Sequence, residues 1–402
     1  MKKLENVTNN YFGPRVSDGA GTFIAGFVFL YVFQIILLIA AYLFKVDIAN
    51  NMPVWFTWMM TVVNQGSLVF GVFVYGKMVN KPLIKETKIT NKIGVKSMLI
   101  IPAIVVASIM AFLPLATGFV KLIELITHKA PSVNMAIGNQ WWEIIISMVF
   151  LSVLPAIGEE ILFRGSVARG LKRKNYLFAI IMSGFMFSIF HGNPAQTVHQ
   201  FFIGMIFAYV YFVTGSLLGS ALAHFLNNAL AVVLEVAQNN LEINLTLGAE
   251  IGIYVAMSIC GIVALYFLLR CLMKFSKEEK GVAQNTDKMA WAKDLGKAFT
   301  IQGIKDNYNR LNSSLKTLFN DECDNWSIDG DIEIDSSWKK TEDLSTDNDT
   351  QNNEKEKDNK IEDLLVKANK ETIRKRKRFD IISMIVAVGL ALCVWVFNLF
   401  LA

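Results

Sequence analysis

The chain has 402 residues, of which 53% are hydrophobic and 12% are aromatic, and its mean hydropathy is +0.40. A soluble domain of this size rarely has such values, so the composition predicts a membrane protein. The net charge of +5 is less informative about orientation than the distribution of charge among the loops. We expect no nucleic-acid partner. The four cysteines form no C-x-x-C pair, which argues against a disulfide framework or a zinc cluster.

Nine apolar segments follow one another along the chain. They lie at about 22–44, 53–75, 98–119, 141–163, 176–191, 197–213, 216–236, 249–273 and 381–401. Segments of about 20 residues or more can span a bilayer as helices. The fifth and sixth are shorter and are separated by residues 192–196 alone, so we expect a hairpin that turns inside the protein. The predicted fold class is all-α, a polytopic helical membrane protein with a core of about eight helices plus a C-terminal membrane anchor.

Composition also divides the chain into three parts. Residues 1–274 are predicted to form the membrane-embedded core, with the motifs described below inside 141–236. Residues 275–379 are rich in polar and charged residues, which predicts a polar cytoplasmic region, partly disordered, that binds a protein partner. Residues 380–402 are predicted to form a C-terminal transmembrane helix.

Basic residues predict the orientation of these segments. Lysines are concentrated between the second and third segments, and four basic residues lie at 169–174, between the fourth and fifth. Because Lys and Arg are enriched in cytoplasmic loops, both loops and the N-terminus are predicted to be cytoplasmic in a multi-pass protein.

Ionisable side chains lie inside or beside three of the apolar segments. They form the patterns Glu159-Glu160-x-x-x-Arg164, Phe187-x-x-x-His191 and His224-x-x-x-Asn228. Such groups are costly in hydrocarbon, so they predict a functional site. Helix positions i and i+4 share a face, so Glu160 and Arg164 are predicted to pair, while Glu159 faces elsewhere and is suited to acid/base work. The alternative is that both carboxylates balance the basic loop at 169–174.

The histidines carry further predictions. His224 and Asn228 share a helix face and can both donate hydrogen bonds, as an oxyanion site requires, or they can form an interhelical pair that holds the bundle together. His199 is expected to be an ordinary satisfied polar residue. Counting the helix rise from the predicted inner face places Glu159 shallow, His224 deeper and His191 deepest.

Together these groups suit attack of an activated water on an amide carbonyl, and two versions of the chemistry are open. Glu159, His191 and His224 are chemically reasonable zinc ligands, although the H-E-x-x-H signature is absent. In the metal-free version Glu159 and His191 activate water, and His224 and Asn228 hold the oxyanion.

The three patterns, in this order and in successive segments, resemble the CPBP family of CAAX proteases and bacteriocin-processing enzymes, also called Abi or type II CAAX endopeptidase-like. The pattern Thr214-Gly215-Ser216-Leu217 also resembles the family. The resemblance covers about 141–236. It implies an intramembrane endopeptidase with Glu159 as general base, His191 assisting it and His224 with Asn228 as oxyanion donors; a zinc cofactor is left open. The chain beyond 274 is not part of the familiar core.

We therefore predict an intramembrane endopeptidase of a bacterial-type cell membrane. Its expected partners are the bilayer and a membrane-associated or lipidated peptide or protein, in which it hydrolyses a peptide bond. The first alternative is a catalytically silent membrane scaffold or bacteriocin-immunity protein whose cytoplasmic tail binds a partner. The second is a transporter that uses Glu159 and His191 as a proton relay, against which we find no clear internal repeat.

Overall fold

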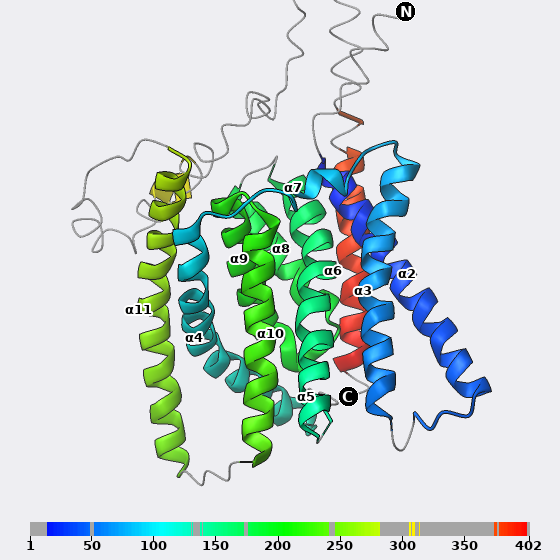
Figure 1. Cartoon of the computed structure of the whole chain (residues 1–402), viewed down its shortest axis with the longest axis horizontal. Helices are drawn as coiled ribbons and strands as arrows, with labels where there is room; N and C mark the ends of the chain where they lie inside the picture. Colours follow the sequence, from blue (N-terminus) through cyan, green and yellow to red (C-terminus); the bar gives the residue numbers. More distant parts are fainter. Residues whose placement is uncertain are drawn as a thin grey trace, which may run out of the picture.

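The computed structural model describes residues 14–48, 52–129, 131, 137–138, 140–172, 176–240, 246–281 and 378–399, with a few isolated residues between 305 and 375. Within these residues the chain is helical and contains no strand. Among the described residues, eight helical elements are long and apolar enough to cross a membrane, and one shorter apolar helix, Tyr176–Phe190, accompanies them. Figure 1 shows how these helices are arranged. The predicted all-α, polytopic membrane fold is confirmed.

The elements follow the predicted segments closely. In chain order they are α2 (Val16–Leu43), α3 (Val54–Met78), η1 (Lys85–Thr87), α4 (Val95–Thr127), α5 (Trp141–Met148), η2 (Val149–Val153), α6 (Leu154–Leu162), η3 (Phe163–Ala168), α7 (Arg169–Leu171), α8 (Tyr176–Phe190), η4 (Pro194–Gln196), α9 (Thr197–Thr214), α10 (Leu217–Asn240), α11 (Leu247–Glu279) and a last helix, Arg378–Leu399. The elements from α5 to α7 form one helical element of 31 residues, interrupted by the π-helical turns η2 and η3.

This element extends further than the sequence predicted, and the depth of Glu159 changes as a result. The predicted apolar segment stopped at residue 163, whereas the helix continues to Leu171 and Arg164 is buried in it. At 1.5 Å per residue, Glu159 lies about 18 Å inside that end. The prediction of a shallow Glu159 is therefore wrong.

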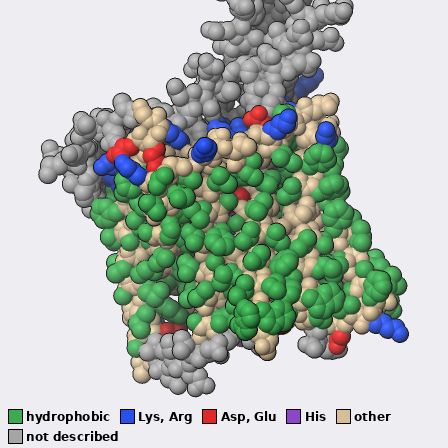
Figure 2. Space-filling view, viewed as in Figure 1, with side chains coloured by type: hydrophobic (Ala, Val, Ile, Leu, Met, Phe, Trp, Pro, Cys, Tyr) green, Lys and Arg blue, Asp and Glu red, His purple; other side chains and the backbone are tan. Residues whose placement is uncertain are grey.

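The outer surface is that of a protein surrounded by lipid. Hydrophobic side chains cover a broad band, and Lys and Arg gather along the edge where α7 and the connection from α3 to α4 lie (Figures 1 and 2). Large apolar residues are exposed within the band, among them Leu99 and Ile36, which are 70% and 57% exposed. Water would not favour so extensive an apolar surface, but a bilayer does.

Inside the band, the helices pack in close pairs. The most extensive contacts join α4 to α11, α2 to α3 and α8 to α9. The turn between α8 and α9 contains the buried residues Gly192 and Pro194, so the predicted internal hairpin is confirmed. The last helix packs into the same core through Ala387 and Ala391, both 0% exposed. The predicted region 275–379 lies almost entirely outside the described residues, and α11 continues into its first five positions.

Two glycines of α3 provide a matched test of the α2–α3 contact. A Cβ atom on Gly71 would lie 2.6 Å from the Cα atom of Gly26 in α2, whereas a Cβ on Gly66 would meet nothing within 4 Å. Because the two backbones touch at Gly71, we predict that Gly71→Ala lowers the free energy of unfolding by about 1–3 kcal/mol. Gly66→Ala should leave it unchanged or raise it by about 0.5–1 kcal/mol, since alanine favours the helix.

Unfolding of both variants in detergent micelles, followed by circular dichroism, measures this difference. Equal stability of the two variants would contradict the close approach of α2 and α3.

Candidate functional site

Four ionisable side chains meet where α6 and η3 pack against α9 and α10. They are Glu159, Glu160, Arg164 and His224, and each side chain is at most 9% exposed. Charges buried to this degree need partners, because their loss of hydration is otherwise uncompensated. The cluster is therefore held together by mutual pairing.

Glu160 is the centre of this pairing. Its Oε1 atom accepts a hydrogen bond of 2.7 Å from Arg164 Nη1 and one of 2.9 Å from His224 Nδ1. Arg164 also donates from Nη2 to the Gly204 carbonyl of α9 at 2.9 Å, and its guanidinium lies 4.6 Å from the centre of the Phe187 ring. The predicted ion pair between Glu160 and Arg164 is confirmed, and it ties α6 to both α9 and α10.

Glu159 lies on the other side of the same imidazole. Its Oε1 accepts from Gln65 Nε2 of α3 at 2.9 Å, and its Oε2 lies 3.8 Å from His224 Nε2. Within the described residues Oε2 has no hydrogen-bond partner. Adjacent helix residues point about 100° apart, which lets the two carboxylates reach different nitrogens of one ring. Gly158 makes room for Gln65, because a Cβ there would lie 2.6 Å from Gln65 Oε1.

His191 stands beside this cluster without joining it directly. Its Nδ1 atom lies 2.7 Å from the Phe187 carbonyl oxygen, which can only accept a hydrogen bond, so Nδ1 carries a hydrogen. In the neutral ring Nε2 then keeps its lone pair and can accept a proton. The Phe187 ring contacts both imidazoles, with centroid distances of 4.8 Å to His191 and 5.7 Å to His224.

Asn228 contacts a different part of the helical element. Its Nδ2 donates to the Leu151 carbonyl at 3.1 Å, in the π-helical turn η2. Leu151 lies four residues before Pro155, and proline has no N–H to offer this carbonyl, so Asn228 supplies the missing donor. The sequence left open whether His224 and Asn228 form an oxyanion site or an interhelical contact. Asn228 does make an interhelical hydrogen bond, and its acceptor is the Leu151 carbonyl. Because a primary amide has two N–H groups, one remains for another acceptor, and the oxyanion role stays a prediction.

Among the described residues, there is no group of three or more His, Cys, Asp or Glu side chains close enough together to hold a metal ion. The predicted zinc set of Glu159, His191 and His224 suits zinc by chemistry, but its geometry in this conformation does not provide a site.

Two residues of this neighbourhood were not anticipated from the sequence. Gln65 binds Glu159, and Asn227 donates from Nδ2 to Asn228 Oδ1 at 3.1 Å. Asn64 and Gln65 are adjacent amides in an otherwise apolar segment, and this signal could have identified Gln65. His199 Nδ1 is buried and has no hydrogen-bond partner among the described residues, so the expectation that His199 is a satisfied polar residue is not confirmed.

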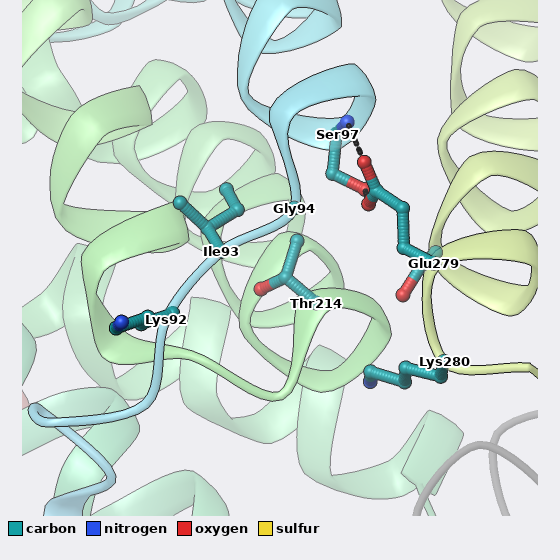
Figure 3. A pocket seen from close by; sticks show the side chains of 8 residues that line it. Lys92, Ile93, Gly94, Ser97, Thr214, Glu279 and Lys280 are labelled. Atoms are coloured by element: carbon teal, nitrogen blue, oxygen red, sulfur yellow. Dashed lines mark hydrogen bonds between the residues drawn. The ribbon is translucent and has the colours of Figure 1, made fainter.

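A cavity of about 240 Å³ lies elsewhere, among the ends of α4, α9 and α11 (Figure 3). The Glu279 carboxylate occupies its side facing α4, accepting from Lys96 N at 2.7 Å and from Ser97 Oγ at 2.6 Å. Glu279 therefore caps the start of α4 from α11. This contact gives Glu279 and Ser97 a structural role that needs no ligand.

The buried ion pair predicts a strong asymmetry between single and double substitutions. Arg164→Met leaves Glu160 without its main cation and should lower the free energy of unfolding by about 3–5 kcal/mol. Adding Glu160→Gln should restore a large part of that loss, because the amide oxygen can still accept from His224. Equilibrium unfolding in mixed micelles provides the double-mutant cycle.

The exposed pair of Lys96 and Glu278, 3.1 Å apart, is the control. Lys96→Met should cost at most about 1 kcal/mol. If Arg164→Met is no more destabilising than Lys96→Met, the cluster does not hold the helices as described.

Comparison with known proteins agrees with the motifs. Residues 140–230 match the family model described as type II CAAX prenyl endopeptidase Rce1-like, and this stretch contains every predicted site residue. No curated protein and no solved structure matches the chain. The resemblance to CAAX-type proteases is confirmed over residues 140–230, the segment that matches the Rce1-like family model.

Proposed function

We propose that this protein is an intramembrane endopeptidase that hydrolyses a peptide bond with a water activated by Glu159. The observation that carries the proposal is the pair formed by Glu159 Oε2 and His224 Nε2. These atoms are buried, face each other at 3.8 Å and come from two helices held in place by the Glu160–Arg164 ion pair. Their separation exceeds that of a hydrogen bond, and we place the attacking water beside these two atoms.

We assign a protonation state to the cluster by counting its charges. Two ionised carboxylates in a low-dielectric interior require two cations, and Arg164 supplies one. A protonated His224 supplies the second, since its two N–H groups then point at Glu160 Oε1 and toward Glu159 Oε2. In this state Glu159 is an ionised base, and His224 Nε2–H is a donor.

The hydrolysis then uses these two groups in turn. Glu159 Oε2 takes a proton from the water as its oxygen bonds to the carbonyl carbon of the substrate. The carbonyl electron pair moves onto oxygen, and His224 Nε2–H donates to this oxyanion. When the tetrahedral intermediate collapses, the C–N bond breaks and Glu159 returns the proton to the leaving nitrogen. Water is consumed, and a carboxylic acid and an amine are formed.

We assign supporting roles to His191 and Asn228. His191 Nε2 keeps its lone pair, so it can accept a hydrogen bond from the water or the leaving amine next to the Phe187 ring. The uncommitted N–H of Asn228 can contribute to the oxyanion, while its other N–H holds the turn at Leu151. Removal of one such donor typically lowers kcat by about 10²–10³-fold.

The substrate we propose is a membrane-associated or lipidated peptide or protein of a bacterial-type cell membrane. A site enclosed by a lipid-facing bundle favours chains that already lie in the bilayer over soluble peptides (Figure 2). The edge rich in Lys and Arg indicates which side faces the cytoplasm. The match to prenyl endopeptidases supports a prenylated C-terminal sequence as the first class to test.

A glutamate variant with a matched control tests this function. Glu159→Gln keeps the hydrogen bond from Gln65 but removes the base, so we expect cleavage to fall by about 10²–10⁴-fold. Glu143→Gln, at the outer end of the same helical element, should leave the rate unchanged. The assay measures cleavage of prenylated and unmodified membrane peptides by the purified protein, with and without a zinc chelator.

Full activity of Glu159→Gln would remove Glu159 from the mechanism, and loss of activity on chelation would favour the zinc version. If the wild-type protein cleaves no peptide of the panel, the scaffold or immunity alternative gains support.

Cysteine labelling tests the proposed orientation. Lys92 lies in the connection from α3 to α4, and Lys45 lies in the connection at the opposite end of α3. In a cysteine-free background, a membrane-impermeant maleimide added to intact cells should label Lys45→Cys but reach Lys92→Cys only after lysis. The reverse pattern would place the N-terminus outside.

A further inference from the structure

The last helix, Arg378–Leu399, binds the turn that follows His191. Trp395 Nε1 donates to Thr197 Oγ1 at 2.8 Å, and Asn398 Nδ2 donates to the Gly192 carbonyl at 2.8 Å. Trp395 and Asn398 are three residues apart, so both project from one face of the helix. The turn therefore receives two hydrogen bonds from a part of the chain about 200 residues away.

The receiving turn is built for this contact. Gly192 has a φ of +62°, a conformation that L side chains rarely adopt, and a Cβ at this position would lie 3.0 Å from Asn398 Nδ2. Thr197, the second acceptor, is bonded back to α8, because its carbonyl accepts from Ser188 Oγ at 2.6 Å. Both acceptors are therefore linked to the neighbourhood of His191. Gly192 follows it in the chain, and Thr197 is hydrogen-bonded to Ser188, three residues before it.

The other end of the last helix is fixed as well. Asp380 accepts from Arg15 Nη2 at 3.3 Å and from the backbone N–H of Ser17 at 3.1 Å, at the start of α2. Between the two ends, Ala387 and Ala391 are fully buried. A helix bonded at both ends and buried in the middle is part of the folded bundle, which distinguishes it from a freely placed anchor.

We propose that Asn398 and Trp395 are positioning residues that hold the His191 turn, so that the last helix, outside the matched segment 140–230, completes the candidate site. The inference rests on the proposed role of His191. The ring of His191 is fixed by the Phe187 carbonyl on one side and follows the backbone of the turn on the other. Moving a catalytic group by about 1 Å can cost about 10²-fold in rate.

The experiment uses the full chain in lipid nanodiscs, with two readouts. The first is kcat and KM for the peptide that the wild-type protein cleaves best. The second is the NMR signal of the ¹³Cε1-labelled His191 ring, which is assigned among the four histidines with His191→Gln. For the double variant Asn398→Leu and Trp395→Phe we expect kcat to fall by about 10- to 100-fold at unchanged KM. The His191 signal should shift, while that of His128, at the end of α4, stays in place.

Two further variants separate positioning from general stability. Ser383→Ala removes a hydrogen bond within the last helix, from Ser383 Oγ to the Phe379 carbonyl, and should change neither readout. Asn398→Gln retains an amide donor and should recover most of the activity lost in Asn398→Leu alone. If the double variant does not fold, this pair of single variants gives the same comparison.

An unchanged His191 signal, or a shifted signal with normal kcat, overturns the proposal. Failure of the proposed function is seen separately, as a wild-type protein that cleaves no peptide or a His191→Gln variant with full activity. If no peptide is cleaved, the His191 signal alone decides whether the last helix holds the turn.

Discussion

The burial of two adjacent carboxylates in a lipid-surrounded bundle is the constraint on which the rest of this structure depends. Glu159 and Glu160 lie too deep for water to solvate them freely, so the surrounding helices must supply partners. Arg164 and His224 compensate Glu160 on both sides, while Gln65 gives Glu159 a single neutral donor. In the proposed mechanism, this difference in environment makes Glu160 the structural carboxylate and Glu159 the reactive one.

Irregular backbone lies next to the polar residues of the candidate site. The π-helical turn η2 precedes Pro155, and the carbonyl that Pro155 leaves without a donor is bonded by Asn228. Gly192 allows the sharp turn after His191, and the last helix covers it. Each irregularity is satisfied by a polar side chain from another helix, as required where water is scarce. The polar residues of the core thus shape the backbone as well as the chemistry.

Local patterns were the part of the structure that could be predicted from the sequence. The helical segments follow from apolar runs, and the Glu160–Arg164 pair follows from i, i+4 spacing. Contacts between distant segments could not be predicted in this way. The hydrogen bonds from Gln65 to Glu159 and from Asn398 to Gly192 correspond to no periodic pattern in the sequence. The end of the fourth segment was misplaced because the apolar run stops at residue 163, while the helix continues through polar and basic positions to Leu171.

The proposed endopeptidase activity can be tested most directly by the origin of the oxygen in the new carboxylate. Cleavage of a membrane peptide in H₂¹⁸O, analysed by mass spectrometry, should place one ¹⁸O atom in the carboxyl group released by the wild-type protein. Products carrying ¹⁸O should be absent over the same time with Glu159→Gln. Equal incorporation by both proteins would show that water is activated without Glu159 and would contradict the role of the buried cluster.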